Sequence, residues 1–453
     1  MSENQGRPNR VSRRAILTAI PVGAVAGAIA GKFDPRGDPP APAPAAPEES
    51  DSSGNREYVD VTQRGVVGDG RTDVASALNE ILTSTPAGHD VFLPSGTYLI
   101  GDRLRLTTGV GLRGAGRGST TVRLADGAGA PFILATDETG IQISGITFDG
   151  GDQGTEAISL QIDGCSVVDV FECAFVRMKH AIHVYSSGTS PSSDVRIHDN
   201  TFSDIVDFAI RASEGSEEVY IERNTIIDVS KGEAPSPAAI YVRGVNILVS
   251  ENTVKASEDT AVLVAGDKTR HVTIANNVLA STLVAIFFGS GARSGLISGN
   301  RIRSTRDFGI HLFDREGSAI ACIVTQNHIM SSGKTGIQAE GVSGFVISAN
   351  IINNPAQGGD QQVEWRCGIA LTATDAGPAS NFVITGNVIS SSSDESQMEH
   401  AILVASGSSG VEITSNVMSG SVGKTVYLRT SLREPYYVDT IDEIRTSRRF
   451  QRD

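Results

Sequence analysis

Three chemically capable side chains recur at one position of a repeated sequence pattern. His183, Arg211 and Tyr241 each follow the isoleucine of a short segment with the form small residue, Ile, any residue, apolar residue. An arginine can hold a carboxylate through two parallel hydrogen bonds, and histidine or tyrosine can accept or donate a proton. We therefore expect Arg211 to neutralise a substrate carboxylate while His183 and Tyr241 act as base and acid.

Further polar residues lie close to these three along the chain. Lys179, His180, Tyr185 and Arg243 are expected at the margins of the same surface, where they would bind substrate. Asp207 is a further catalytic candidate because a carboxyl group can transfer protons. These residues together predict one polar site that is assembled from neighbouring repeats.

The elements that would position this site form a sequence repeat. An aliphatic residue, two further residues, Asn, one residue and an apolar residue occur in this order nine times, with the Asn residues 23 to 37 positions apart. Such a period is typical of stacked supersecondary units. One Asn at a fixed turn of each unit predicts a ladder of side-chain amides, so we interpret these residues as structural. They are Asn200, Asn224, Asn252, Asn277, Asn300, Asn327, Asn350, Asn387 and Asn416.

Each unit holds two short segments with the alternation of a β-strand and no segment with the period of a helix. A leucine-rich repeat has an Asn in a similar place, but here the apolar positions are Ile and Val, and a second strand stands where a helix would be expected. The sequence therefore predicts an all-β fold, a single-stranded right-handed parallel β-helix with a short capping helix over residues 74–83.

Strand alternation predicts which side chains point outward. The residue after the buried Ile should face solvent, and this outward column is polar in the early units and largely apolar in the late ones. Long insertions at 228–237, 353–366 and 390–400 enter the same strand and are expected to stand as walls beside it. Trp365 lies in the longest insertion, where it either packs the loop or stacks on substrate.

The ends of the chain differ in composition from the repeats. Residues 1–31 combine a basic start, the pair Arg13-Arg14 and an apolar run, which predicts a twin-arginine-type signal peptide and a secreted or cell-surface protein. Contact with a membrane is expected only through this segment if it stays uncleaved. Residues 32–56 read as a Pro/Ala/acidic disordered linker, 57–430 as the β-helix domain, and 431–453 as a tail that covers the last coil.

Three motifs at the start of the domain carry a family resemblance. Residues 59–73 contain Gly-Asp-Gly-Arg-Thr-Asp, 91–98 read Val-Phe-Leu-Pro-Ser-Gly-Thr-Tyr, and 110–116 read Val-Gly-Leu-Arg-Gly-Ala-Gly. With the Asn repeats, this order resembles the pectate-lyase-like superfamily of right-handed parallel β-helix proteins. The resemblance implies a sugar-binding surface on the strand that holds His183 and Arg211. The combination of Arg211 with His183 and Tyr241 on this surface favours an acidic polysaccharide as substrate and a polysaccharide lyase as the leading activity.

Two other functions remain open at this stage. A glycoside hydrolase needs two carboxyl groups roughly 5 to 9.5 Å apart, which Asp207, Asp228 and Glu233 could supply. The sequence lacks the Asn-Thr-Asp, Asp-Asp and His-Gly motifs of polygalacturonases, the hydrolases of this superfamily. It also lacks the Asp-Pro-His-Glu motif of alginate C5-epimerases. A non-catalytic surface or carbohydrate-binding protein is the third alternative.

Charge and cysteine content narrow the possible partners. The formal net charge of -14 argues against nucleic acid as a partner. The four cysteines have no metal-site spacing and no calcium-loop motif is visible, although Ca²⁺ stays possible because lyases of this shape often use it. We interpret Cys165 and Cys173 as buried thiols, with a disulfide between them as the alternative. The oligomeric state is expected to be monomer or trimer.

Overall fold

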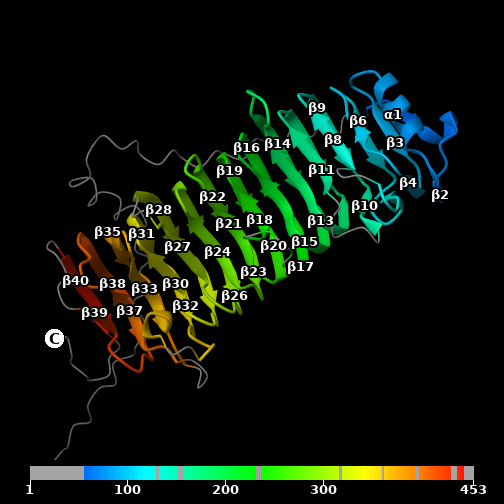
Figure 1. Cartoon of the computed structure of the whole chain (residues 1–453). Coiled ribbons are helices and arrows are strands. Elements are labelled where there is room, and N and C mark those ends of the chain that lie inside the picture. The colour runs from blue at the N-terminus through cyan, green and yellow to red at the C-terminus, as the bar shows by residue number, and fades with distance from the viewer. Residues whose placement is uncertain are drawn as a thin grey trace, which may run out of the picture. The chain divides into compact units, whose positions relative to one another are not determined.

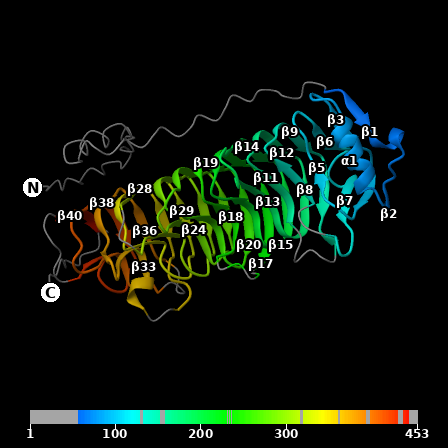
Figure 2. The ribbon, with the colours of Figure 1, turned by 45° about the horizontal axis from the view of Figure 1, so that its top comes forward.

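The computed structural model describes residues 56–442, except 129–131, 152–157, 231, 233, 235, 316–318, 360–361, 393–396 and 430–435. The predicted signal peptide, nearly all of the predicted linker, and parts of the predicted tail lie outside the described residues. The described chain winds as a parallel β-solenoid (Figures 1 and 2), which confirms the predicted fold class. Within these residues no helix has the length and apolar character needed to cross a membrane.

Each coil contributes strands to three parallel stacks, because the same apolar pattern repeats and pairs in register with the coils before and after it. The first stack holds the strands that precede the Asn turn. Its strands are β1 (Tyr58–Asp60), β3 (Asp90–Leu93), β6 (Gly111–Gly114), β9 (Thr139–Ser144), β12 (Ser166–Phe171), β14 (Ser192–His198), β16 (Ser216–Glu222), β19 (Val245–Ser250), β22 (Arg270–Ala275), β25 (Arg293–Ser298), β28 (Ala319–Thr325), β31 (Ser343–Ser348), β35 (Ser380–Thr385), β38 (Val411–Ser419) and β40 (Tyr436–Asp442).

The second stack follows the Asn turn and also contains the ends of β38 and β40, and the long strands β13 and β15 run on from it into the third stack. Its strands are β2 (Asp69–Asp73), β4 (Gly96–Ile100), β7 (Thr120–Leu124), β10 (Thr147–Asp149), β13 (Ala174–Tyr185), β15 (Thr201–Ala212), β17 (Thr225–Ser230), β20 (Thr253–Ser257), β23 (Val278–Ala280), β26 (Arg301–Arg303), β29 (His328–Met330), β32 (Ile351–Asn353) and β36 (Val388–Ser390).

The third stack contains the small-Ile-x-apolar segments and carries the predicted site. Besides the ends of β13 and β15, its strands are β5 (Leu104–Arg105), β8 (Ile133–Thr136), β11 (Ile158–Asp163), β18 (Ala238–Val242), β21 (Thr260–Val264), β24 (Val284–Gly289), β27 (Ile310–Phe313), β30 (Ile337–Glu340), β33 (Cys367–Thr374), β37 (His400–Val404) and β39 (Val426–Leu428). A two-residue strand, β34 (Gly377–Pro378), pairs antiparallel with β33.

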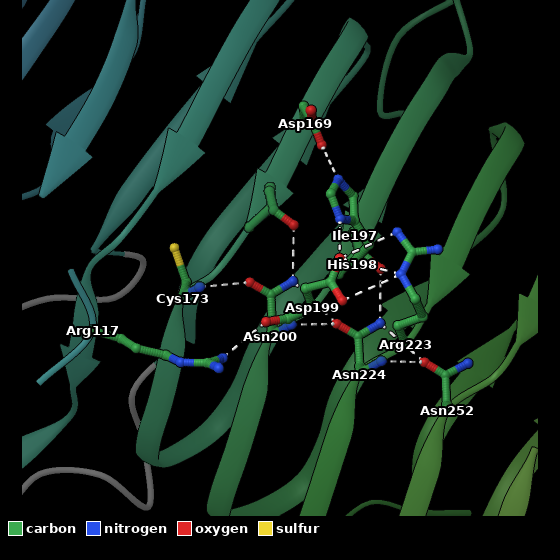
Figure 3. A network of polar contacts seen from close by, with 11 residues as sticks. Arg117, Asp169, Cys173, Ile197, His198, Asp199, Asn200, Arg223, Asn224 and Asn252 are labelled. Atoms are coloured by element: carbon green, nitrogen blue, oxygen red, sulfur yellow. Dashed lines mark hydrogen bonds and ion pairs between the residues drawn. The ribbon is translucent and has the colours of Figure 1, made fainter. Parts of the chain in front are cut away.

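The predicted asparagine ladder is present. Every one of its nine residues is at most 1% exposed. At a typical rung, Asn224 Nδ2 donates to the carbonyl of Ile197 at 2.7 Å and to Asn252 Oδ1 at 3.0 Å, which also accepts the Asn224 backbone N–H (Figure 3). The residue before each Asn adopts a positive φ, as at Arg223 with 53°, so the chain turns sharply there. The ladder thereby satisfies buried polar groups at the corner between the first two stacks.

The interior is filled by one apolar cluster that runs along the coils. Phe148, Phe175 and Phe202 stack on one another with ring centroids 5.2 and 5.0 Å apart, and Ile and Val occupy most other inward positions. Helix α1 (Ala75–Ser84), one residue later than predicted, contributes its buried face to this cluster at the N-terminal end (Figure 1). The described residues also contain the 3-10 segments η2 (Val61–Arg64) and η4 (Val363–Trp365).

All four cysteines are buried free thiols, as predicted. Cys173 occupies the ladder position above Asn200, and its backbone N–H donates to Asn200 Oδ1 at 3.0 Å. At the other end, the described part of the predicted tail forms β40, which pairs in parallel with β38. The last coil therefore gains one further strand from the C-terminal segment.

Candidate active site on the third strand stack

The structure places His183, Arg211 and Tyr241 side by side on β13, β15 and β18, in the predicted register. The isoleucine before each of them is fully buried, whereas the three polar side chains are partly exposed. Because successive side chains of a strand point to opposite faces, the three face away from the core. We call the outward column from Gln161 to His311 the floor; its members are Gln161, His183, Arg211, Tyr241, Leu263, Phe287 and His311.

Arg211 lies between two aromatic rings. Its guanidinium carbon is 5.1 Å from the ring centre of Phe208 and 5.5 Å from that of Tyr241. Its Nε is buried without a hydrogen-bond partner, and no described carboxylate lies within ion-pair distance of it. Burial lowers the pKa of Arg211, but an arginine stays protonated in proteins. Arg211 is therefore a partly desolvated cation that can receive an anion from outside.

His183 is held in its neutral form. Burial, followed by the charge of Arg211, lowers the pKa of His183 to about 3. Its Nε2 lies 2.9 Å from the hydroxyl oxygen of Ser213, and its ring stacks on Tyr185 with centroids 4.5 Å apart. Among the described residues its Nδ1 has no hydrogen-bond partner. A pKa this low keeps the imidazole neutral but makes it a weak base. An anion bound at Arg211 would offset the charge that contributes to the low pKa and thereby favour proton transfer to the available nitrogen.

Asp207 precedes Arg211 on β15, and its carboxylate binds backbone N–H groups of a neighbouring loop. It is 1% exposed, and its Oδ1 accepts the backbone N–H groups of Gly232 at 3.0 Å and Ala234 at 3.3 Å. Oδ2 lies 3.8 Å from His180 Nε2. Burial, then Arg211, lowers the pKa of His180 to about 4, so this is a contact with a neutral ring. Asp207 thus fixes the loop after β17 and the ring of His180.

The other predicted binding residues are distributed along the same stack. Tyr185 is next to His183 and donates to Gln161 Oε1 at 3.4 Å; burial and then Asp163 raise the pKa of Tyr185. Arg243 follows Tyr241, and its Nη2 lies 3.8 Å from Glu214 Oε1. Lys179 precedes His180 on β13 and is partly exposed. These residues therefore lie on the same strand as His183 or, in the case of Arg243, shortly after Tyr241, and their part in substrate binding stays a prediction.

Trp365 is not brought together with Arg211. It lies in η4, where the ammonium of Lys334 is 4.1 Å from its ring centre, and the neighbouring Glu364 carbonyl accepts from Thr335 Oγ1. Val363 of the same segment packs on the late part of the column, against a buried cluster formed by Cys367, Ala370 and Leu403. This insertion covers the column, whereas the sequence predicted a wall beside it. Ala370 in this cluster is 0% exposed, and Gln338 on the neighbouring strand is 1% exposed.

An aromatic cluster at the end of the floor was not found from the sequence. The ring of His311 lies 4.8 Å from that of Phe308, 5.3 Å from that of Phe287 and 5.6 Å from that of Phe313. Its Nε2 is 3.4 Å from Glu340 Oε2. Strand alternation predicts Phe287 and His311 as outward positions, and Phe313 follows the same alternation. Phe308 comes from a loop that strand periodicity does not place, so the cluster itself could not be predicted.

A second polar network, on the first stack, was also missed (Figure 3). His198 lies 3.0 Å from Asp169 Oδ1 through Nε2 and 2.8 Å from Asp199 Oδ2 through Nδ1. Burial alone would lower the pKa of His198, but these two carboxylates outweigh it and raise that pKa. Arg223 also binds Asp199, at 3.2 Å. Both ring nitrogens of His198 are engaged, so the network links neighbouring coils and leaves neither nitrogen available to accept a proton from a substrate.

No group of three or more potential metal ligands occurs in the part of the chain that the structure describes. The possible dependence on Ca²⁺ stays a prediction. Of the carboxyl groups predicted for hydrolysis, Asp207 is buried and Glu233 lies outside the described residues. Asp228 is exposed, as is Asp204 on the adjacent coil, and both line a cavity of about 550 Å³ together with Arg306. This cavity lies at the turn that precedes the floor strands.

Comparisons with known proteins agree with the fold. In a search of solved structures, the A-module of the mannuronan C-5 epimerase AlgE6 from Azotobacter vinelandii matches with a TM-score of 0.61 and 16% identity, covering 85% of this chain and all of that one. The alginate lyase AlyF-OU02 in complex with G6 matches with a TM-score of 0.52 and 12% identity over 84% of this chain and 89% of that one. The Dettilon tailspike protein matches with a TM-score of 0.54 and 15% identity, over 82% and 68%.

No curated protein matches the chain. A family model described as right handed beta helix region matches residues 238–418. A second model, described as rhamnogalacturonase A/epimerase, pectate lyase-like, matches residues 58–311, which include all of the floor. The chain belongs to this pectate lyase-like family.

Proposed function

We propose that the protein binds an acidic polysaccharide along the floor and cleaves it by β-elimination. The observation that carries this proposal is Arg211, a partly buried cation without an anionic partner among the described residues, placed between neutral His183 and Tyr241. A buried charge is costly unless it is paired. A uronate carboxylate would complete the site because it matches the guanidinium in charge and geometry.

The three side chains supply the parts of an elimination. Arg211 neutralises the uronate carboxylate, which makes the proton on the adjacent C5 more acidic. His183 accepts that proton through its unprotonated nitrogen, and the C5 electron pair forms the C4–C5 double bond as the C4–O bond breaks. Tyr241 donates its phenolic proton to the leaving oxygen. His183 and Tyr241 each stand one strand spacing of about 4.8 Å from Arg211, so both can reach a sugar held above it.

The test mixes the purified protein with uronate polysaccharides and follows the absorbance of unsaturated uronate ends together with new reducing ends. We expect both signals to rise. Arg211→Ala should lower kcat/KM by roughly 100-fold or more, the scale observed when one preorganised charge-stabilising donor is removed. Arg301→Ala is the matched control, because Arg301 is an exposed outward arginine on the second stack. An Arg211→Ala variant with intact lyase activity would show that the reaction occurs elsewhere.

Hydrolysis is a second candidate, favoured by the exposed carboxylates of Asp204 and Asp228 in the cavity next to the floor. Carboxyl groups on adjacent coils are about one strand spacing apart, which is close to the separation that a retaining glycosidase needs. This activity would produce reducing ends without unsaturated ends, and it would be lost in Asp228→Asn. Retention of the polymer without either product would instead indicate a binding protein.

The predicted export signal supports a site of action outside the cell, where polysaccharides are accessible. We propose that the protein is exported by the twin-arginine route. Fusion of residues 1–31 to a reporter that is active only after export tests this, with the pair Arg13-Arg14 changed to lysines as the control that should abolish the signal.

A further inference from the structure

The floor carries a single cation on its central column. Arg211 is followed by Tyr241, Leu263 and Phe287, none of which is charged. A pyranose unit in an extended polysaccharide is about as long as one strand spacing of about 4.8 Å. Successive units of such a chain alternate in orientation, so a polymer made only of uronates with one carboxylate on Arg211 would place the next one that faces the floor over Leu263. Leu263 would remove water from that carboxylate and return no hydrogen bond, which is unfavourable.

Cations at the margins do not change this pattern. Arg243 lies near Glu214 at 3.8 Å, and Lys334 binds Asp307 at 3.1 Å while it covers the ring of Trp365. Lys179 is on β13, upstream of Arg211. The downstream half of the floor is thus apolar and aromatic, and Arg243 and Lys334 beside it already have carboxylate partners.

The cluster around His311 has the character of a subsite for a neutral sugar. Phe287 and Phe313 are partly exposed beside it and can contact the C–H face of a pyranose. The side chains of His311 and Glu340 are 14% and 32% exposed, so their polar atoms can exchange hydrogen bonds with sugar hydroxyls. The carboxylate of Glu340 would repel a uronate at this position.

Register fixes the separation between this subsite and the anion site. Arg211 and His311 are joined by four successive strand pairings, which correspond to about 19 Å at a spacing of about 4.8 Å. That length corresponds to about four sugar units. Beyond His311 the column closes, because Gln338 and Ala370 are buried and Val363 of η4 packs on the cluster that contains Ala370.

We propose that the floor recognises a heteropolysaccharide in which an isolated uronate at Arg211 is followed by neutral sugars that extend to the His311 cluster. This inference rests on the proposed function and adds the class of substrate. The same geometry assigns Phe287 and His311 to substrate binding, at a distance from the reacting bond.

The test compares polymers of the two classes with the full protein. Polygalacturonate and polymannuronate represent homopolyuronates, whereas gellan, xanthan and glucuronoxylan carry a uronate among neutral sugars. We expect at least one heteropolymer to bind at least tenfold more tightly than either homopolymer. Phe287→Ala and His311→Ala should each weaken heteropolymer binding or raise KM at least fivefold with kcat little changed. Phe92→Ala, which removes an aromatic ring from the first stack far from the floor, is the matched control.

The outcomes separate this inference from the proposed function. If homopolyuronates bind as well as every heteropolymer and the Phe287 and His311 variants are unaffected, while Arg211→Ala still abolishes activity, the inference of neutral sugars is overturned and the proposed function stands. If no uronate polymer binds, or Arg211→Ala has no effect, the proposed function fails together with it. Circular dichroism of each variant checks that the β-helix is folded.

Discussion

Replacing Asn277 by alanine should destabilise the β-helix strongly, because this residue is in the middle of the asparagine ladder and 0% exposed. Its Nδ2 donates to the Val249 carbonyl and to Asn300 Oδ1, both at 2.9 Å. Its Oδ1 accepts the backbone N–H of Asn252 at 2.9 Å and the Nδ2 of Asn252 at 3.1 Å. Alanine removes all of these bonds and leaves the Val249 carbonyl and the Asn252 N–H groups buried without these partners.

The expected magnitude follows from the number of broken contacts. A net contribution of about 1 kcal/mol for each hydrogen bond, with an additional penalty for stranded buried groups, gives a loss of about 3 to 5 kcal/mol in the free energy of unfolding. The assay is urea unfolding followed by circular dichroism, compared at the midpoint with a shared slope. Coils interact mainly with their neighbours, so in this variant the backbone amides of the adjacent coils should exchange hydrogen faster than those of more distant coils.

Asn276→Gly is the control for this variant. Asn276 is the neighbouring residue, exposed, with a φ of 58° that glycine adopts readily. The free energy of unfolding of Asn276→Gly should differ from that of the wild type by no more than about 1 kcal/mol. If Asn277→Ala matched this control, the buried amides would contribute nothing to the stability of the solenoid, and the interpretation of the ladder would be refuted.

Three further predictions concern titratable groups. The pKa of His183 is about 3 in the fold and 6.5 when unperturbed, so protonation of this side chain favours the unfolded state as pH falls between these values. The free energy of unfolding of His183→Gln, measured by urea unfolding, should therefore fall less than that of the wild type from pH 6.5 toward pH 4. The pKa of His198 is raised, so its contribution is present below pH 6.5 and lost as pH rises through the folded value; His198→Gln should cost more stability in mild acid than in mild alkali, and an equal cost would contradict the two-carboxylate network. Burial raises the pKa of all four thiols, that of Cys173 to about 12; a thiol reagent should label them only after unfolding, and rapid labelling of the folded protein would contradict their burial. These are Cys165, Cys173, Cys322 and Cys367.

Several properties could be predicted from the sequence because they are local and repeated. Strand alternation has a period of two residues, so the position after each buried Ile had to face outward, and this placed His183, Arg211 and Tyr241 in one column. A fixed turn with one Asn in each unit could satisfy its buried amide only by bonding to the next unit, which predicted the ladder.

Other properties depend on contacts between distant parts of the chain, and only the tertiary structure decided them. His198 meets Asp169 across 29 residues, and Asp207 binds loop backbone 25 residues away. The insertion with η4 covers the late column because Val363 finds an apolar surface there. Such contacts depend on the paths of loops, and loops have no period in the sequence. The sequence repeat therefore determined the coil and which of its residues face outward. Packing between coils and loops decided which of those outward residues stay accessible to substrate.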